Sequence, residues 1–383
     1  MQYLKRLTLI LSLLFVVLSC ENRNNQTEKD YFIEWDKSSL VCIAEEGAYP
    51  RLIRLSNDSL LAVYENRVGD VVLKKSGDDG STWSDEIHAF KAFNYNDETK
   101  VNIANPEIIQ LPNGDLLLAV NLRPRIEGVY PFSIALKRSF DAGETWSEAN
   151  ILYQASTFFK DGCWEPSFLI LPDESIHIYF ANEYPYQQSD EQEISVIKSI
   201  DNGFTWTNEP QTVSFRNGHR DGMPIAVHDN EMIYVVIEDN ISGQFKPWII
   251  SGSIENSWGK PVYSDSPDRY SALKHKLPDT VYAGAPYMIK TDNDVYLISY
   301  QTTENRTSNW EHSTMEVVVS DKHFEFRNPS QPFKVPLHKE AKWNSIADLG
   351  NNTIAALSTT NFNSQKVGIW MIKGVVSERT SNQ

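Results

Sequence analysis

Residues 76–83 of this 383-residue chain read SGDDGSTW, and the same pattern returns as SFDAGETW at residues 139–146 and as SIDNGFTW at residues 199–206. A fourth stretch, SGSIENSW at residues 251–258, keeps only the terminal serine and tryptophan. Successive tryptophans are 63, 60 and 52 residues apart, and a period of this length indicates repeated structural units. Each copy predicts a tight turn, because Gly accepts a positive φ and Asp bonds to nearby backbone amides. We therefore expect a structural role for Asp78, Asp141 and Asp201.

A second repeat counts the structural units. Each copy starts at a Pro, or at a residue in its place, and continues as an apolar strand, a polar turn and a second apolar strand. The six copies start at Tyr49-Pro50, Asn105-Pro106, Glu165-Pro166, Met223-Pro224, Ala285-Pro286 and Asn344-Ser345. Their spacings are 56, 60, 58, 62 and 59 residues. A Pro is tolerated at the start of a strand, where its missing N–H is not needed. Six copies predict six similar sheets.

The octapeptide resembles the Asp-box of sialidase-like β-propellers. We therefore expect an all-β fold, a sialidase-like six-bladed β-propeller over residues 31–378, which absorbs the whole length in one ring. The resemblance implies that the first strand of each blade lines the central axis and that the octapeptide joins the third and fourth strands. We expect the ring to close by pairing a strand near residues 32–43 with residues 368–376.

The N-terminus has the features of a targeting segment. Lys5 and Arg6 precede an apolar stretch at residues 7–18 that is too short to span a bilayer, so residues 1–19 are expected to be a signal peptide. The sequence VLSC, ending at Cys20, resembles a bacterial lipobox, in which the mature chain begins at a lipidated cysteine. Residues 20–30 then form a polar, flexible tether. We expect an exported bacterial lipoprotein, periplasmic or at the outer membrane or cell surface. A plain secretory signal is the alternative.

Composition excludes several classes of partner. The formal net charge is −16, which argues against nucleic acid, because phosphate contact needs a basic surface. No Cys/His spacing indicates a metal site, and no glycine-rich loop indicates a phosphate-bearing cofactor. Cys42 and Cys163 fall in different blades, so we expect two separate thiols. We expect a monomer without metal or cofactor, touching a membrane only through the lipid anchor.

Two glutamates stand out among the residues that should meet around the axis. Glu165 follows Trp164 at the entrance of an apolar strand, where partial desolvation raises the pKa of a carboxyl group and suits it to act as a general acid. Glu238 ends the apolar run at residues 232–237, which returns it to the level where the first strands begin. Two carboxylates flanking a glycosidic bond are the minimum apparatus for glycoside hydrolysis, and a separation of about 5–5.5 Å indicates a retaining mechanism.

Each of these two glutamates also has a purely structural interpretation. Backbone amides at the strand entrance are the alternative partners of Glu165, and a solvent-facing strand end is the alternative environment of Glu238. Glu65 and Glu183 occupy comparable places in blades one and three and are reserve candidates.

Three stretches together resemble glycoside hydrolase family 93: Trp164-Glu165-Pro166, RDGMP at residues 220–224 and VVIE at residues 235–238. The resemblance covers roughly residues 40–376. It implies a retaining, exo-acting α-1,5-L-arabinanase that releases arabino-oligosaccharide units from arabinan, so that the partner is an oligo- or polysaccharide. Carried over by motif, Glu165 matches the acid/base of the family and Glu238 matches its nucleophile.

Two other functions stay open. An exo-α-sialidase needs three arginines around the substrate carboxylate and a tyrosine nucleophile. Its usual Arg-Ile-Pro motif in blade one is absent, since Arg51 follows Pro50, although the sequence leaves other arginines near the axis: Arg123, Arg220 and Arg306, with Arg269 expected in a loop. A non-catalytic glycan-binding propeller is the second alternative, and its stacking residues would come from Trp164, Trp248, Trp310 and Trp343.

Further residues around the axis are candidates for substrate binding. Trp164 is expected to exclude water from the acid, and Arg220 is expected to keep Glu238 ionised, with a surface salt bridge as the alternative. Arg51 and Arg123 are expected to bind hydroxyl groups or to neutralise nearby carboxylates. Hydrogen bonds to sugar hydroxyls are expected from Asn105, Asp221 and Asn344.

The lipobox resemblance makes a direct prediction about Cys20. Replacing this residue by serine removes the only expected site of lipid attachment, so the Cys20→Ser chain should move from the membrane fraction to a soluble compartment. Cell fractionation followed by immunoblotting measures this, with the wild-type chain as control. Continued retention of the variant in the membrane fraction would count against the lipid anchor.

Overall fold

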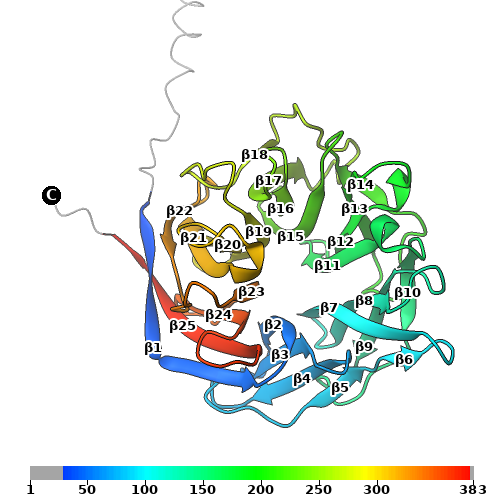
Figure 1. The fold of residues 1–383 in the computed structure, drawn as a ribbon, viewed down its shortest axis with the longest axis horizontal. Coiled ribbons are helices and arrows are strands. Elements are labelled where there is room, and N and C mark those ends of the chain that lie inside the picture. Colours follow the sequence, from blue (N-terminus) through cyan, green and yellow to red (C-terminus); the bar gives the residue numbers. More distant parts are fainter. Residues whose placement is uncertain (1–28, 380–383) are drawn as a thin grey trace, which may run out of the picture.

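The computed structural model describes residues 29–379, which form six antiparallel β-sheets around one central axis (Figure 1). The inner strand of each sheet faces the centre of the ring, and the other strands follow outward (Figure 1). The fold is a six-bladed β-propeller, which confirms the number of blades predicted from the strand repeat. The predicted signal peptide, Cys20 and most of the tether lie outside the described residues.

The blades are numbered here by the order of their inner strands. Blade one contains β2 (Ala48–Arg54), β3 (Leu60–Glu65), β4 (Val71–Ser76) and β5 (Ile87–Phe90). Blade two contains β7 (Lys100–Gln110), β8 (Leu116–Pro124), β9 (Ser133–Ser139) and β10 (Asn150–Gln154), with the short β6 (Phe93–Asn94) beside β7. Blade three contains β11 (Cys163–Ile170), β12 (Ile176–Asn182), β13 (Glu193–Ser199) and β14 (Gln211–Ser214).

The second half of the ring repeats this order. Blade four contains β15 (Asp221–Asp229), β16 (Met232–Asp239), β17 (Lys246–Ser253) and β18 (Arg269–Ser271). Blade five contains β19 (Ala283–Lys290), β20 (Tyr296–Thr302), β21 (Thr314–Ser320) and β22 (Arg327–Ser330). Blade six contains β23 (Ala341–Asp348), β24 (Thr353–Thr360), β25 (Gly368–Glu378) and β1 (Tyr31–Ala44).

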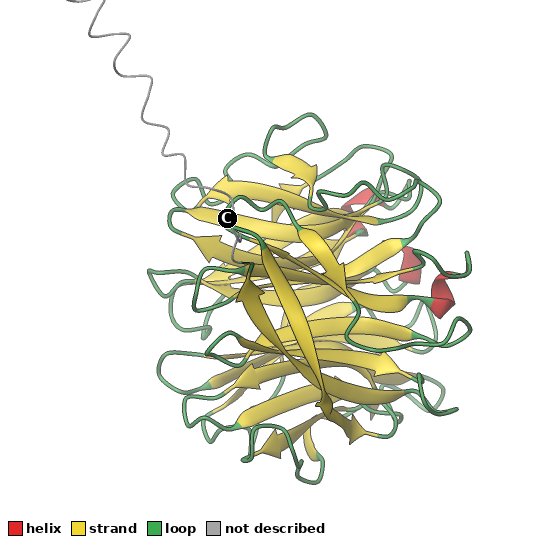
Figure 2. Ribbon diagram, turned by 90° about the vertical axis from the view of Figure 1, so that its left-hand side faces the viewer, coloured by secondary structure: helices red, strands yellow, loops and turns green. Residues whose placement is uncertain are grey.

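The three short 3-10 helices lie at one face of the ring (Figure 2). They are η1 (Phe159–Asp161), η2 (Tyr184–Tyr186) and η3 (Trp310–His312). They precede the inner strand of blade three or follow the second strand of blades three and five, so at this face the inner strands begin and the second strands end. We call it the mouth of the channel. None of the helices in residues 29–379 is long and apolar enough to cross a membrane.

The two ends of the described chain close the ring. β1 pairs antiparallel with β25, and Tyr31 lies opposite Glu378 at one end of the ladder and Ala44 opposite Ile369 at the other. The two strands run together along the outer side of blade six (Figure 2). This confirms the closure predicted from the sequence, in which the first strand of the chain becomes the fourth strand of the last blade.

Every inner strand carries a β-bulge at the same place. The bulged residue has a left-handed backbone, with φ between 48° and 52°, in Tyr49, Asn105, Glu165, Met223, Ala285 and Trp343. The sixth member corrects the register predicted from the sequence by one residue, because Asn344, and not Ser345, stands where the other blades have Pro. A bulge re-aims the side chain that it carries, and positive φ in non-glycine residues is strained and concentrates at functional sites.

A repeated hydrogen bond joins neighbouring blades at the level of these bulges. The last residues of the second strands accept a hydrogen bond from the N–H of the bulged residue of the next blade. Four such bonds are present: Asn121 with Glu165 at 2.8 Å, Glu238 with Ala285 at 2.8 Å, Gln301 with Trp343 at 2.8 Å, and Thr359 with Tyr49 at 3.1 Å. We call these bonds the inter-blade staples, and they hold the strained backbone in place around the mouth.

The octapeptide turns lie at the opposite face. In blade two the turn follows the end of β9 that points away from the mouth, and it leads into β10. Asp141 accepts hydrogen bonds from the Thr145 hydroxyl at 2.5 Å, the Thr145 N–H at 2.8 Å and the Ser139 hydroxyl at 2.8 Å. These bonds, those from Thr145 first, lower the pKa of Asp141 to about 2. The predicted structural role of these aspartates agrees with this geometry.

The hydrophobic core is divided among the interfaces between blades. One cluster packs Leu169 and Tyr179 of blade three against Val235 and Ile250 of blade four, and similar clusters fill the other interfaces. The two cysteines in the described part of the chain are free thiols, as predicted.

The staple at Asn121 makes a prediction about stability. Its buried amide accepts from the Glu165 N–H and donates to the Cys163 carbonyl at 2.7 Å. The Asn121→Ala variant leaves both backbone groups unpaired, and each unpaired buried group costs about 1–3 kcal/mol. We expect the free energy of unfolding in a denaturant titration to fall by about 2–4 kcal/mol, against less than about 0.5 kcal/mol for Asn208→Ala, whose side chain is exposed. Equal effects of the two substitutions would show that the staple is not a structural support.

Candidate active site

The bulges and the second-strand ends bring Glu165 and Glu238 to the same mouth. Glu165 is the bulged residue of β11, and Glu238 lies near the end of β16, opposite Gly222 in the register of blade four. The negative charge of Glu238 raises the pKa of Glu165, so the two carboxyl groups are close enough to interact. The structure thus brings the two predicted catalytic residues together across the interface between blades three and four.

Glu165 is placed to hold a proton near neutral pH. Burial, followed by the charge of Glu238, raises its pKa to about 8, against the opposing charge of Arg123. Its backbone N–H is taken by the Asn121 staple, whereas its carboxyl group makes no hydrogen bond within the described residues. The predicted structural alternative for Glu165, a carboxylate satisfied by backbone amides, is therefore not what the structure shows.

Glu238 lies in a tighter and more polar environment. Burial raises its pKa to about 7, while the Ala285 N–H, which donates to Oε2 at 2.8 Å, and the charge of Arg220 lower it. A Cβ on Gly284 would lie 2.6 Å from Oε2, and a Cβ on Gly222 would lie 3.0 Å from Oε1. Two glycines therefore make room for this carboxylate. Because Glu238 receives the Ala285 N–H and the Glu165 carboxyl group receives no hydrogen bond from the described residues, Glu238 ionises first and its charge then opposes ionisation of Glu165.

Sequence reasoning missed Tyr282, which lies beside Glu238. Its hydroxyl oxygen accepts a hydrogen bond from the Gln301 amide at 2.8 Å, and a Cβ on Gly284 would lie 2.5 Å from that oxygen and 2.6 Å from the Glu238 carboxylate. Burial and the charge of Glu238 raise the pKa of Tyr282 far above its usual value, so the hydroxyl keeps its proton. Tyr282 stands three residues before the bulged residue of blade five, as Arg220 does in blade four. This shared position in the repeat is the signal by which Tyr282 could have been found in the sequence.

Arg123 forms a second side of the mouth. Its guanidinium lies 5.2 Å from the centre of the Trp164 ring and 5.8 Å from that of Phe159. Trp164 is buried and packs against Phe159, with ring centres 4.7 Å apart. The charge of Arg123 lowers the pKa of both Glu65 and Glu165, although it makes no ion pair or hydrogen bond in residues 29–379. Arg123 is therefore fixed by aromatic stacking and keeps its donors free.

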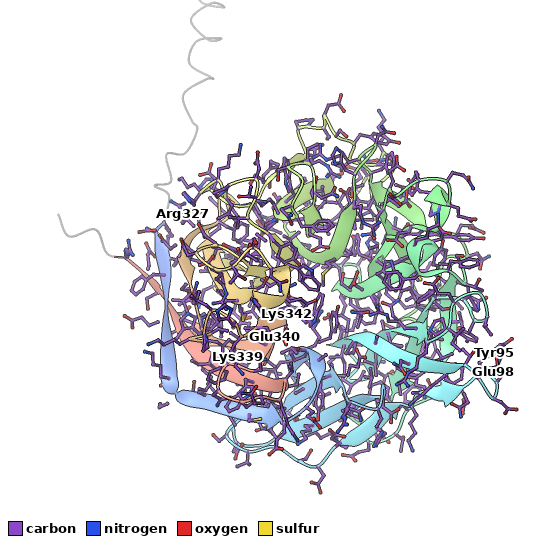
Figure 3. All side chains as sticks on the ribbon, in the orientation of Figure 1. Tyr95, Glu98, Arg327, Lys339, Glu340 and Lys342 are labelled. Atoms are coloured by element: carbon purple, nitrogen blue, oxygen red, sulfur yellow. The ribbon has the colours of Figure 1, made fainter. Side chains whose placement is uncertain are left out.

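Aromatic residues form the remaining side of the mouth. Tyr49 and Trp343, from blades one and six, stack with ring centres 4.6 Å apart. Trp310 is 42% exposed, and the Lys342 ammonium lies 4.6 Å from the centre of its ring. Lys342 and its ion-pair partner Glu340 belong to the blade-six side of the channel, whereas Tyr95 and Glu98 lie at the outer rim of blade two (Figure 3).

Arg220 does not bind the carboxylate predicted for it. Its guanidinium forms an ion pair with Glu183 and a hydrogen bond to the Gln192 side chain at 2.7 Å. Its charge still lowers the pKa of Glu238 and of Glu165. The positioning of Glu238 thus comes from the Ala285 N–H and the adjacent glycines, and Arg220 acts on it only through its charge.

Asp221 is a structural residue and does not bind hydroxyl groups as expected. It is fully buried, accepts from the Ser214 hydroxyl at 2.7 Å and pairs with Arg269, which also pairs with Asp239. Arg269 belongs to β18 and not to a loop. The sequence could not reveal this network, because its members come from two different blades and meet only in the folded ring.

The other expected hydroxyl-binding residues are also buried. Asn105 and Asn344 are each 2% exposed, and Asn344 accepts from the Ser358 hydroxyl at 2.8 Å. Neither side chain offers its polar atoms to a ligand at the mouth. These two expectations are therefore corrected. The Asn344 side chain follows the bulge instead of occupying it, whereas the Asn105 side chain stands at the bulge but is covered by its neighbours.

Arg51 closes the channel below the mouth. It forms an ion pair with Glu107 of blade two at 2.7 Å, and Glu107 accepts from the Tyr287 hydroxyl of blade five at 2.9 Å. Arg51 therefore neutralises a carboxylate, one of its two expected roles, and does not reach a ligand at the mouth. Deeper in the channel a separate cavity of about 520 Å³ is lined by the inner strands of all six blades. We call Arg51, Glu107 and Tyr287 the channel floor.

No group of three or more metal-ligating side chains gathers anywhere in residues 29–379.

Comparison with known proteins finds solved structures of similar fold. No protein-family model matches the chain. The α-L-arabinofuranosidase of Fusarium graminearum, of glycoside hydrolase family 93 and solved with arabinobiose, superposes with a TM-score of 0.63 and 16% identity over 87% of this chain and 97% of that one. The Penicillium chrysogenum α-L-arabinanase, also solved with arabinobiose, gives 0.60 and 17% over 89% and 98%.

Sialidases share the fold as well. Trypanosoma rangeli sialidase superposes with a TM-score of 0.57 and 12% identity over 86% of this chain and 54% of that one. A sialidase of Micromonospora viridifaciens is 30% identical over 125 residues, which is 29% of this chain and 19% of the sialidase. At these identities the solved structures establish a shared sialidase-like propeller fold, in agreement with the fold that the octapeptide resemblance implies.

The raised pKa of Glu165 predicts a pH-dependent stability. Because the folded pKa of about 8 exceeds the ordinary value of 4.5, the protonated group contributes stability that is complete below pH 4.5 and is lost as the pH rises through 8. The melting temperature of Glu165→Gln should therefore rise relative to wild type between pH 5 and pH 8.5. Exposed Glu148→Gln, on the opposite face, should show a constant difference. A constant difference for Glu165→Gln too would mean that its pKa is ordinary.

Proposed function

We propose that this chain is a retaining, exo-acting glycoside hydrolase whose substrate is α-1,5-linked arabinan. The observation that carries the proposal is the pair of interacting carboxyl groups at one mouth, in two different environments. Glu238 receives a backbone N–H, which favours the carboxylate, whereas the Glu165 carboxyl group receives no hydrogen bond from the described residues and faces a negative charge, which favours the protonated acid. Environments that push two pKa values apart assign the acid and the base.

In this proposal Glu165 protonates the leaving glycosidic oxygen and later removes a proton from the attacking water. Glu238 attacks the anomeric carbon and forms the glycosyl-enzyme. Tyr282 keeps its proton and offers its hydroxyl as a donor beside the Glu238 carboxylate, which steadies the nucleophile before attack. Trp164 and Phe159 limit the access of water to Glu165 and so maintain its raised pKa.

The channel floor supports exo-action. The Arg51–Glu107–Tyr287 network crosses the axis just below the mouth, so a substrate entering there meets a closed end. A blind pocket accepts the terminus of a polysaccharide and not its middle. The solved arabinobiose complexes of the Fusarium and Penicillium proteins, which have the same fold, are the support for arabinan as the polymer.

The alternative of an exo-α-sialidase is disfavoured by the state of the arginines. A substrate carboxylate needs several free guanidinium groups around it. Arg51, Arg220 and Arg269 are each paired with a carboxylate of the protein, and Arg306 donates to four backbone carbonyls. Arg123 alone among these axis candidates keeps its donors free. Tyr282 beside Glu238 is the one feature in favour of a tyrosine nucleophile.

The first experiment compares substrates and then tests the carboxyl groups. The purified chain should release arabino-oligosaccharides from linear α-1,5-arabinan and leave sialyllactose intact, with product of retained configuration detected by proton NMR. Glu238→Ala should abolish turnover and be rescued by azide with inverted product, since azide replaces the missing nucleophile. Glu165→Ala should slow substrates with poor leaving groups far more than activated aryl glycosides. Glu148→Gln is the matched control.

The pH profile gives an independent check on the roles. Activity requires ionised Glu238 and protonated Glu165, so kcat/KM should rise as the pH approaches about 7 and fall above about 8. Glu165→Gln should remove the alkaline limb for an activated aryl glycoside. Unchanged turnover in both carboxyl variants would contradict these two roles, whereas no turnover of any glycan by the wild-type chain would leave the glycan-binding propeller as the remaining interpretation. Export as a lipoprotein is likewise a proposal, and it would bring such an enzyme to polymers outside the cytoplasm.

A further inference from the structure

Two of the six staple positions make no inter-blade bond: Ala181 of blade three, whose side chain has no polar atom, and Glu65 of blade one. Glu65 ends β3 opposite Ala48, which is the register position that Glu238 holds opposite Gly222 in blade four. Four members of this series bind the N–H of the next bulged residue. Glu65 makes no such bond to Asn105, and it has no hydrogen bond or ion pair in residues 29–379. Its carboxylate is half-buried at the mouth and is free to bind a ligand.

Arg123 is the natural partner for this carboxylate, yet the two do not join. Burial raises the pKa of Glu65, and the charge of Arg123 lowers it. No hydrogen bond or ion pair joins the two side chains. Stacking on Trp164 and Phe159 holds the guanidinium in place. A long arginine that is already fixed loses little side-chain entropy when it binds a ligand. A titratable carboxyl group and a guanidinium, both half-exposed and both without a hydrogen bond or ion pair within the described residues, therefore face one mouth.

We propose that Glu65 and Arg123 form a clamp that binds two neighbouring hydroxyl groups of a neutral sugar. A carboxylate accepts the hydrogen of one hydroxyl, and a guanidinium donates to the oxygen of the next. A vicinal diol offers both at once. The clamp lies on the Glu165 side of the mouth, because Arg123 acts on both Glu65 and Glu165. It rests on the proposed hydrolase function and deepens it by naming the residues that select the sugar.

The clamp would favour a neutral sugar over an anionic one. Three carboxyl groups, those of Glu65, Glu165 and Glu238, gather near one unpaired guanidinium in the described part of the chain. An anionic sugar would bring another negative charge to this site, whereas hydroxyl groups satisfy both members of the clamp without adding charge. The competing interpretation is that Glu65 and Arg123 form an ion pair with each other. In that case their substitution should lower the melting temperature and leave the affinity for sugars unchanged.

The test measures binding separately from turnover. Calorimetry on the Glu238→Gln chain, which should bind without cleaving, is carried out with α-1,5-arabinotriose and with methyl glycosides of neutral pentoses and hexoses. The same titrations follow with Glu65→Gln or Arg123→Gln added. Each added change removes a hydrogen bond to a charged group, so the affinity should fall about tenfold or more. Melting temperatures compared at one pH should fall little, because Glu65 forms no hydrogen bond or ion pair with another described residue and Arg123 loses only its stacking on Trp164 and Phe159.

Controls and deoxy sugars sharpen the outcome. Arg125→Gln and Glu148→Gln remove a neighbouring guanidinium and a distant carboxylate, and they should leave affinity within about twofold of the parent chain, since surface changes away from a site have small effects. Deoxy analogues that lack one hydroxyl of the pair should bind weakly to the Glu238→Gln chain, since a polar site rejects a ligand that leaves it unpaired. In the clamp variant that lacks the matching side chain, removal of that hydroxyl should cause no further loss of affinity.

Several results would overturn the clamp. These are unchanged affinity in both clamp variants, a large drop in melting temperature with unchanged affinity, or no binding by any sugar of the panel. Binding that depends on the clamp without hydrolysis by the wild-type chain would keep the clamp and refute the proposed hydrolase. The failure of the two proposals can therefore be told apart.

Discussion

The structure depends on one repeated constraint, the strained bulge at the start of each inner strand and the hydrogen bond that holds it. A left-handed backbone at a residue such as Glu165 or Ala285 persists only where its surroundings over-determine it. The inter-blade staples do this at four of the six bulges by tying them to the preceding blade. The side chains aimed at the axis therefore keep one direction, which a site built from several blades requires.

The candidate active site uses the same positions as the structural repeat. Asn121 and Gln301 are neutral staples, and Glu238 is a charged one that makes the same bond to the next blade. A single residue thus supports the ring and presents a carboxylate to the mouth, and its second oxygen, Oε1, is the one left for chemistry. Substitution by Gln keeps the staple and removes the charge, which separates the two roles.

Electrostatics then distinguish the two carboxyl groups. Both are partly desolvated, which raises both pKa values, but only Glu238 has a backbone donor and adjacent glycines that leave it room. Its earlier ionisation keeps Glu165 protonated. The buried ion network of Asp221, Asp239 and Arg269 joins the first, second and fourth strands of blade four. Such buried charges are tolerated because each is compensated by a partner.

The amino-acid sequence alone determined the number of blades, the closure of the ring and the place of Glu165 and Glu238. Those features follow from local periodicity, since a Pro, an apolar strand and a polar turn recur at nearly constant spacing. Only the tertiary structure decided that Trp343 is the sixth bulge, that Asp221 is buried, and that Tyr282 lies beside Glu238. These facts depend on the one-residue register of a bulge and on side-chain contacts between strands distant in the chain, and the periodicity of apolar strands specifies neither.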